Sequence, residues 1–193
     1  MRGTVATASA NISGVIPIVE TDRLILRAHG TADYDACVAM WADPIVVRHI
    51  SGVPSTPAQT WMRLLTYPGL WGILGFGYWA VEERASGAYV GDVGFADFRR
   101  EIVPSIAGVP ELGWVIAPQA HGKGYATEAA RAALAWADAN IDAPRTVCII
   151  DPANLASIRV AEKSGFHEVA KTTYKGEPTI VFERLRAEVL RML

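Results

Sequence analysis

A pair of glycines stands between a short apolar segment and a strongly helical one. The segment Glu111–Ala117, ELGWVIA, has the pattern of a buried strand, and residues 127–139, TEAARAALAWADA, have the pattern of a helix. Gly122 and Gly124 lie in the connection between them. A helix N-terminus carries unpaired N–H groups and a positive dipole end, and glycine lets an anion approach the backbone. The junction therefore predicts a binding site for a phosphate or pyrophosphate.

The spacing of the two glycines restricts which kind of phosphate-binding loop they can form. The Walker pattern GxxxxGK[ST] is missing, and no glycine stands three residues after Gly124, as the Rossmann pattern GxGxxG requires. The pattern that remains is Q-x-x-G-x-G, formed by Gln119, Gly122 and Gly124. It resembles the acetyl-CoA loop of the GCN5-related N-acetyltransferases, the GNAT family. Taken alone, the motif fits an ordinary strand–turn–helix with a glycine-rich turn equally well.

Two further segments resemble the RimJ/RimL-like branch of that family. Residues 151–166, DPANLASIRVAEKSGF, reproduce its N-x-x-S…GF pattern through Asn154, Ser157 and the final Gly165-Phe166. Residues 20–36, ETDRLILRAHGTADYDA, are similar to its opening strand and first helix. The resemblance covers roughly residues 18–183. Three separated motifs in the right order are specific for the family, but they say little about the substrate.

The resemblance implies a single α/β domain of the GNAT fold over residues 18–193, preceded by a disordered extension over residues 1–17. Its sheet is mixed, mostly antiparallel, flanked by helices and splayed at the cofactor strands. The order of the predicted elements agrees with one such domain. The patterns predict a first helix over 32–43, with Thr31 as N-cap and Pro44 as stop, and further helices over 57–67, 127–139 and 154–163. They also predict hairpins over 76–98 and 166–184 and a strand over 145–150. A loose loop is expected through Gly69, Gly72, Gly75 and Gly77, and a last helical turn or two over 185–193.

Composition places the chain among soluble cytoplasmic enzymes and excludes several other classes. The 193 residues suit one domain, and no apolar run is long enough to span a bilayer although 51% of the residues are hydrophobic. The net charge of −2 argues against nucleic acid as a direct partner, and the first residues lack the apolar core of a signal peptide. Cys37 and Cys148 are predicted to be buried thiols, no metal-binding cluster is visible, and a monomer or homodimer is expected.

The resemblance also implies acetyl-CoA as co-substrate and a set of residues that hold it. The pantetheine arm is expected to lie along the strand 111–117 and to hydrogen-bond its backbone near Val115 and Ile116. Asn154 is expected near the cofactor as well as at a helix cap. The backbone amides expected around the pyrophosphate are those of His121, Gly122, Lys123, Gly124, Tyr125 and Ala126.

Two side chains are candidates for catalysis. Glu111 opens the cofactor strand, where the family often places a carboxylate that takes a proton from the amine; a solvent-facing strand end is the equal alternative. The rival carboxylates are Asp92, Asp97 and Asp151. In many family members a tyrosine seven residues after the asparagine protonates the leaving thiolate, but that position is Ala161 here. The RimJ/RimL-like branch instead carries a serine three residues after the asparagine, so the resemblance makes Ser157 the candidate near the sulfur, with a role in capping the helix as its alternative.

These residues predict an N-acetyltransferase in which a primary amine attacks acetyl-CoA directly. The region Trp61–Trp79, expected to line the acceptor site, is aromatic and glycine-rich, with Arg63 as its one charged residue. A peptide N-terminus, as in a ribosomal protein, is the preferred acceptor, and a small-molecule amine is the first alternative. A silent acyl-CoA-binding domain is the second, and a nucleotide-phosphate binder is disfavoured because the Walker lysine and hydroxyl pair is missing.

Overall fold

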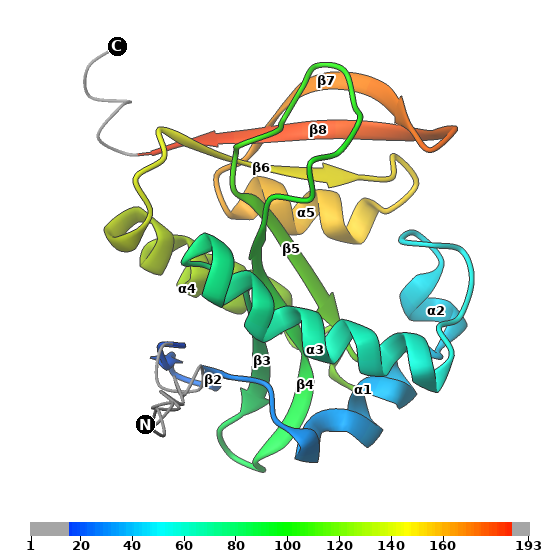
Figure 1. The fold of residues 1–193 in the computed structure, drawn as a ribbon, viewed down its shortest axis with the longest axis vertical. Coiled ribbons are helices and arrows are strands. Elements are labelled where there is room, and N and C mark those ends of the chain that lie inside the picture. Colours follow the sequence, from blue (N-terminus) through cyan, green and yellow to red (C-terminus); the bar gives the residue numbers. More distant parts are fainter. Residues whose placement is uncertain (1–15, 187–193) are drawn as a thin grey trace, which may run out of the picture.

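The computed structural model describes residues 16–186, which form one mixed sheet with helices on both faces (Figure 1). The strands lie in the order β1-β2-β3-β4-β5-β6-β8-β7, and β5 and β6 are the parallel neighbours. The strands are β1 (Val19–Glu20), β2 (Leu24–Arg27), β3 (Tyr78–Glu83), β4 (Ala88–Ala96), β5 (Glu111–Ile116), β6 (Arg145–Ile150), β7 (His167–Tyr174) and β8 (Glu177–Leu185). The helices are α1 (Tyr34–Trp41), α2 (Pro44–Val47), α3 (Pro57–Leu74), α4 (Tyr125–Asn140) and α5 (Leu155–Lys163).

The two faces of the sheet bury different sets of side chains, because successive residues of a strand point to opposite sides. Trp79, Phe95 and Leu112 pack with α4 and α5 in the larger cluster of buried residues. Ala80 and Tyr89 point the other way and pack with α1, α2 and α3. Figure 1 shows α3 crossing in front of the central strands and α4 behind them. Any group on β3, β4 or β5 is therefore assigned to one face by its position in the strand.

The predicted loop through Gly69 and Gly72 is wrong, because α3 continues to Leu74. Trp71 in this last part is 3% exposed and packs against Trp79, and that burial outweighs the low helix propensity of the glycines. The helix stops at Gly75, whose φ of 76° is the left-handed conformation that ends many helices. Its beginning at Pro57, after the N-cap, is as predicted.

The first predicted helix is divided into a 3-10 turn and α1, and its predicted N-cap is wrong, whereas α1 stops before Pro44 as predicted. Thr31 starts a short 3-10 turn instead of capping it, because the Asp33 carboxylate turns back to the Gly30 N–H at 2.8 Å. Pro44 also begins a further short helix, α2, which the sequence did not predict. The Asp43 side chain accepts from the Ile45 N–H at 2.7 Å, so the chain is capped again at that point.

Both predicted hairpins and the predicted strand over 145–150 are confirmed. Cys37 in α1 and Cys148 in β6 are buried, as expected. Within residues 16–186, no helix combines the length and the apolar character needed to cross a membrane. The predicted extension lies outside the described residues up to residue 15, while the Pro17 carbonyl accepts from the Trp79 indole at 2.8 Å. Of the predicted tail helix, residues 187–193 lie outside the described part.

Strand β5 has one open edge. It pairs with β4 along its whole length, from Ala96↔Glu111 to Gly91↔Ile116. It pairs with β6 only at Glu111↔Val147, and β6 pairs with β8 along its own length instead. The two parallel strands thus diverge from the start of β5 towards the glycine loop, and the sheet is split there.

Candidate active site

The glycine loop follows the diverging end of β5 and leads directly into α4. Gly122 and Gly124 have φ values of 75° and 81°, which side-chain-bearing residues rarely adopt. The first helical hydrogen bond runs from the Glu128 N–H to the Gly124 carbonyl at 3.2 Å. The N–H groups of Tyr125 and Ala126 therefore precede the hydrogen-bond ladder and are free for an anion. This is the geometry that the sequence predicted for the junction.

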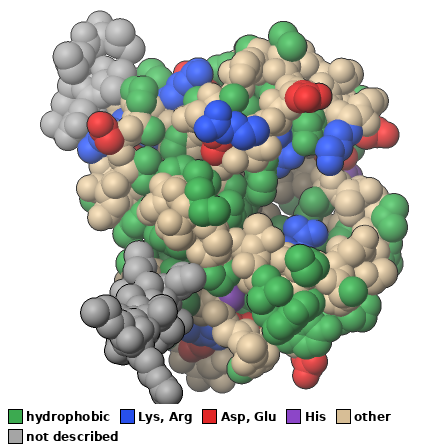
Figure 2. All heavy atoms as spheres, in the orientation of Figure 1, with side chains coloured by type: hydrophobic (Ala, Val, Ile, Leu, Met, Phe, Trp, Pro, Cys, Tyr) green, Lys and Arg blue, Asp and Glu red, His purple; other side chains and the backbone are tan. Residues whose placement is uncertain are grey.

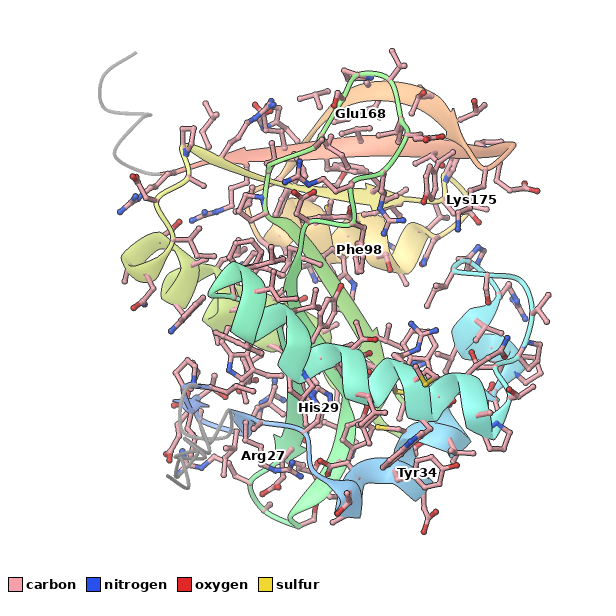
Figure 3. The ribbon with its side chains drawn as sticks, in the orientation of Figure 1. Arg27, His29, Tyr34, Phe98, Glu168 and Lys175 are labelled. Atoms are coloured by element: carbon pink, nitrogen blue, oxygen red, sulfur yellow. The ribbon has the colours of Figure 1, made fainter. Side chains whose placement is uncertain are left out.

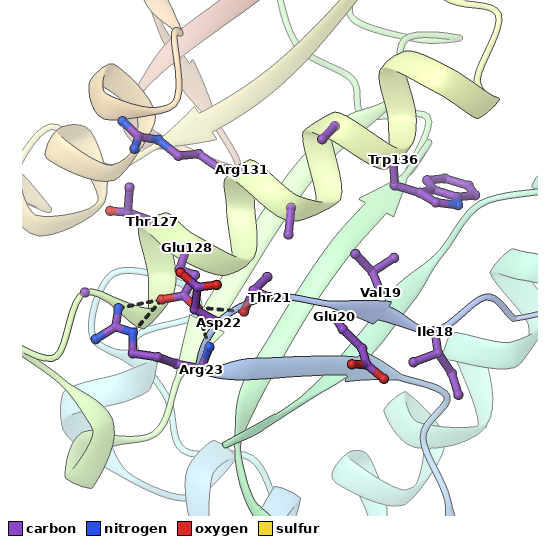
Figure 4. Close-up of a pocket in the computed structure, with 13 residues that line it drawn as sticks. Ile18, Val19, Glu20, Thr21, Asp22, Arg23, Thr127, Glu128, Arg131 and Trp136 are labelled. Atoms are coloured by element: carbon purple, nitrogen blue, oxygen red, sulfur yellow. Dashed lines mark hydrogen bonds and ion pairs between the residues drawn. The ribbon is translucent and has the colours of Figure 1, made fainter. Parts of the chain in front are cut away.

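An ion pair holds the loop against the residues just before β2. The Arg23 guanidinium donates to the Lys123 carbonyl at 2.9 Å. It also donates to the Glu128 carboxylate at 2.7 Å (Figure 4). The Thr21 hydroxyl donates to the other Glu128 oxygen, also at 2.7 Å. Burial alone would raise the pKa of Glu128, but the hydrogen bonds from Thr21 and Arg23 outweigh it, and the pKa is lowered. No local pattern in the sequence predicts these contacts, because 100 or more residues separate the partners.

Two side chains of the loop turn towards β3. The Lys123 ammonium lies 3.3 Å from the Glu83 carboxylate, and the Tyr125 hydroxyl donates to the same oxygen. Hydrogen bonds from Ser86, Tyr125 and Lys123, in that order of importance, lower the pKa of Glu83 to about 2. With Lys123 paired in this way, the capacity of the loop to bind an anion rests mainly on its backbone.

The register with β4 decides which residues of β5 face the split. The Ala117 N–H donates to the Val90 carbonyl at 2.9 Å, so the backbone of Ala117 is directed towards β4. In an antiparallel pair this direction alternates. The backbone of Val115 therefore also faces β4, whereas Trp114 and Ile116 face the open edge. Sequence reasoning named Val115 and missed Trp114, because only the pairing with β4 distinguishes them.

The ring of His121 covers one of these open groups. Its Nε2 lies 2.7 Å from the Ile116 carbonyl oxygen, and because a carbonyl can only accept, Nε2 carries the proton. The Ile116 N–H remains directed towards the split. His121 thus contacts β5 through its ring, in addition to the backbone role that the sequence suggested.

Glu111 is buried, so the alternative of a solvent-facing strand end is wrong. Its side chain is 7% exposed, and both carboxylate oxygens accept from the Arg100 guanidinium, at 2.6 and 2.7 Å. The same guanidinium lies over the rings of Phe98 and Tyr174, at 4.7 and 4.9 Å from their centres. Burial opposes the charge of Arg100, but Glu111 outweighs it, and the pKa of Arg100 is raised.

The rival carboxylate Asp92 is enclosed beneath α1 and α3. It is fully buried, and its two oxygens accept from four donors: His29 Nε2 at 2.8 Å, Tyr89 at 2.5 Å, Tyr67 at 2.9 Å and Trp41 at 3.2 Å. The His29 ring also contacts the Tyr67 ring at a tilt of 31°, with 4.4 Å between ring centres, close to α3 in Figure 3. A carboxylate with about four lone-pair sites is saturated by these contacts, which indicates a structural role.

The other two rivals hold loops. Asp97 accepts from the Gly108 N–H at 3.2 Å and pairs with Arg99 at 2.8 Å, which fixes the connection between β4 and β5. Asp151 follows β6 and lies 2.6 Å from the Nδ1 atom of His49, just beyond α2. A backbone hydrogen bond from residue 153 and the contact with His49 lower the pKa of Asp151 despite its partial burial.

Asn154 and Ser157 lie on the opposite face from Glu111. The Asn154 side chain accepts from the Ser157 N–H at 3.1 Å, so Asn154 caps α5 and the alternative of Ser157 as the cap is wrong. Within the described residues, the Ser157 hydroxyl forms no hydrogen bond. Ala161 is fully buried against α4, so the site of the family's tyrosine is closed here.

Residues 23–167 match the family model described as an acetyltransferase (GNAT) domain. The chain belongs to the GNAT acetyltransferase family. It is 32% identical to the uncharacterized protein YkkB of Bacillus subtilis over 172 residues, which cover 85% of this chain and 93% of that protein. A putative GNAT-family acetyltransferase from Bordetella pertussis has 31% identity and a TM-score of 0.77, covering 87% of this chain and 99% of that one.

Two more distant solved structures share the GNAT fold alone. RimL, a ribosomal L7/L12 α-N-protein acetyltransferase in complex with coenzyme A, has a TM-score of 0.71 at 15% identity and covers 88% of this chain and 98% of its own. AAC(6')-Ib, in complex with paromomycin and acetyl-CoA, has a TM-score of 0.72 at 18% identity, with coverage of 88% and 97%. The chain is a GNAT N-acetyltransferase, and the family's acetyl donor is acetyl-CoA. Within residues 16–186, no three His, Cys, Asp or Glu side chains gather as metal ligands.

Proposed function

We propose that this GNAT enzyme transfers acetyl from acetyl-CoA directly to a primary amine, by preference the N-terminal α-amine of a protein or peptide such as a ribosomal protein. One observation carries the proposal: the open edge of β5 leads straight to the glycine loop at the N-terminus of α4. An extended arm that ends in a pyrophosphate fits this combination, since the edge offers strand-like hydrogen bonds and the loop offers N–H groups.

The two faces of the sheet at the split suit two different steps: one face carries Glu111 for accepting the amine proton, and the other carries Ser157 near the leaving thiolate. An amine must be neutral to attack, and its proton must then be accepted. Glu111 stands at the start of β5, on the face covered by α1–α3, and we assign it as the base. The nitrogen–carbon bond forms as the carbon–sulfur bond breaks. The thiolate is left on the α5 side, where the Ser157 hydroxyl can hydrogen-bond it.

The charges on the Glu111 side favour an acceptor with a single amine. An aminoglycoside carries several ammonium groups and needs several free carboxylates. Here Glu111 is paired with Arg100, Asp151 with His49, and Asp92 is saturated. A peptide N-terminus brings one amine, and Glu111 can accept its single proton because Arg100 uses only one lone-pair site on each carboxylate oxygen.

The region Trp61–Trp79 lines the acceptor side less directly than the sequence suggested. Trp71 and Trp79 are buried in the cluster around α4, whereas Met62, Leu65 and Ile73 lie exposed on α3. Figure 2 shows hydrophobic side chains gathered on this face of the molecule. Tyr67 and Tyr78 stack at 5.2 Å, and their hydroxyl groups reach Asp92 of β4 and Gly113 of β5.

A CoA-release assay tests the proposal against its alternatives. The panel contains peptides with small N-terminal residues, the same peptides with blocked N-termini, aminoglycosides and simple amines. Free peptides are expected to outperform aminoglycosides, and blocking the N-terminus is expected to abolish their turnover. Turnover of an aminoglycoside and of no peptide would establish the small-molecule alternative. Acetyl-CoA binding without CoA release for any amine would establish the silent domain.

A further inference from the structure

The side chain of Tyr78 reaches from β3 across β4 to the cofactor strand. Tyr78 pairs with Gly94, and Gly94 pairs with Gly113 of β5, so the three positions form one row across the sheet. A Cβ atom added at Gly113 would lie 2.1 Å from the Tyr78 hydroxyl oxygen and 3.1 Å from the ring carbon that bears it. The hydroxyl thus rests directly on the backbone of Gly113, two residues beyond Glu111.

The ring of Tyr78 is held rigidly in this position. It stacks on Tyr67 with 5.2 Å between ring centres and 25° between planes, and the Tyr67 hydroxyl donates to Asp92 at 2.9 Å. The position of Gly94 on β4 leaves no room for a side chain, since a Cβ atom there would lie 2.4 Å from the Tyr78 Cα atom. The saturated Asp92 cluster therefore positions Tyr78 through Tyr67.

The hydroxyl itself forms no hydrogen bond within residues 16–186, and Tyr78 is half-buried. Two other tyrosines on this face have a partner: Tyr67 of α3 and Tyr89 of β4 both donate to Asp92. Burial, and next the nearby Glu111, raise the pKa of Tyr78, so the phenol stays protonated. The hydroxyl oxygen is not one of the fully buried polar atoms, so this fixed and neutral group is accessible to a bound molecule.

We propose that the Tyr78 hydroxyl receives the acceptor amine over Gly113 and orients it for attack. The hydroxyl oxygen accepts a hydrogen bond from the amine N–H, which turns the nitrogen lone pair towards the thioester carbon. The amine proton then passes to the Glu111 carboxylate, on the same face of β5, while the electrons of the carbon–sulfur bond go to sulfur. This inference rests on the proposed function, because it places the acetyl group beside the open edge of β5.

The first experiment is Tyr78→Phe, which keeps the ring and its stacking on Tyr67. We expect kcat/KM for the amine to fall about tenfold, the effect of losing one oriented hydrogen bond in the transition state. The Kd for acetyl-CoA by calorimetry and the melting temperature are expected to stay unchanged. Tyr34→Phe is the matched control, since the Tyr34 hydroxyl lies 3.4 Å from the Pro57 carbonyl in a different part of the molecule.

A second variant tests the contact with Gly113. Gly113→Ala must displace the Tyr78 hydroxyl, so it is expected to lower kcat/KM for the amine. In the Tyr78→Phe background the clashing oxygen is gone, and the added methyl group is expected to cost little more. The two losses are therefore expected to be strongly non-additive.

Three results would overturn the assignment: a kcat/KM for Tyr78→Phe within twofold of wild type, additive losses in the pair, or a weakened acetyl-CoA affinity with amine kinetics intact. All variants are measured with the amine of the panel that the wild type uses best. If that amine is an aminoglycoside, the proposed acceptor is wrong, and the role of Tyr78 is still decided on that substrate.

Discussion

Replacing Glu111 by glutamine tests the stability and the chemistry of the site together. Glutamine keeps one oxygen for Arg100 but loses the charge and one of the hydrogen bonds of 2.6 and 2.7 Å. A hydrogen bond to a charged group contributes about 1.5–3 kcal/mol. The Arg100 side chain is 19% exposed, so water partly replaces the lost partner. We expect the free energy of unfolding to fall by about 2 kcal/mol, a decrease in melting temperature of roughly 4–8 °C.

Urea denaturation measures this loss as a lower midpoint at unchanged m-value. Arg100→Gln should cost a similar amount, and the double variant less than the sum, because the two groups act as one pair. A loss below ~0.5 kcal/mol for Glu111→Gln, or additive losses in the double variant, would refute the reasoning that this pair is a buried and coupled one.

The activity of the same variant, measured well below its melting temperature, tests the base. If Glu111 accepts the amine proton, turnover at pH 7 should fall about 100-fold or more. The deficit should shrink towards pH ~9, because a peptide α-amine with a pKa near ~8 is then already neutral. Acetyl-CoA affinity should change little. Full activity of Glu111→Gln across this range would mean that water or another group accepts the proton.

Four further variants test the remaining assignments. Gly124→Glu should abolish acetyl-CoA binding in calorimetry while the circular dichroism spectrum is kept; unchanged affinity would remove the loop from the cofactor site. Ser157→Ala should lower turnover without recovery at high pH, and a recovery like that of the base variant would argue against a role at the sulfur. Asp92→Asn should cost about 3–5 kcal/mol in urea, because four donors lose a charged acceptor; a loss below ~1 kcal/mol would contradict that structural role. The pKa of Glu128 is lowered in the folded state. The stabilisation by the Glu128 carboxylate is therefore present above its unfolded pKa near ~4.3 and is lost as the pH falls through the folded pKa. Glu128→Gln should lose less stability on acidification than wild type, and parallel acid profiles of the two proteins would contradict the pairing with Arg23.

Local chemistry made several features of this protein predictable from the sequence. Gly122 and Gly124 stand where the backbone needs positive φ, and Asn154 stands where a helix needs a cap. Such signals depend on a few neighbouring residues, so they can be read without knowing the fold. The alternation of apolar residues likewise indicated β5 and the hairpins. Predictions from local sequence were wrong where burial outweighed local propensity. Gly69 and Gly72 lie within α3 because Trp71 packs on the sheet.

The tertiary structure alone decided what the site residues can do. Glu111 meets Arg100 across the β4–β5 connection, the register with β4 turns Trp114 and Ile116 towards the split, and Tyr78 reaches Gly113 across an intervening strand. Each of these contacts joins two segments of the chain, and no sequence motif predicts that the two segments meet. Pairing between strands and packing between helices and sheet set them, because a one-residue change of register would move every side chain of β5 to the other face.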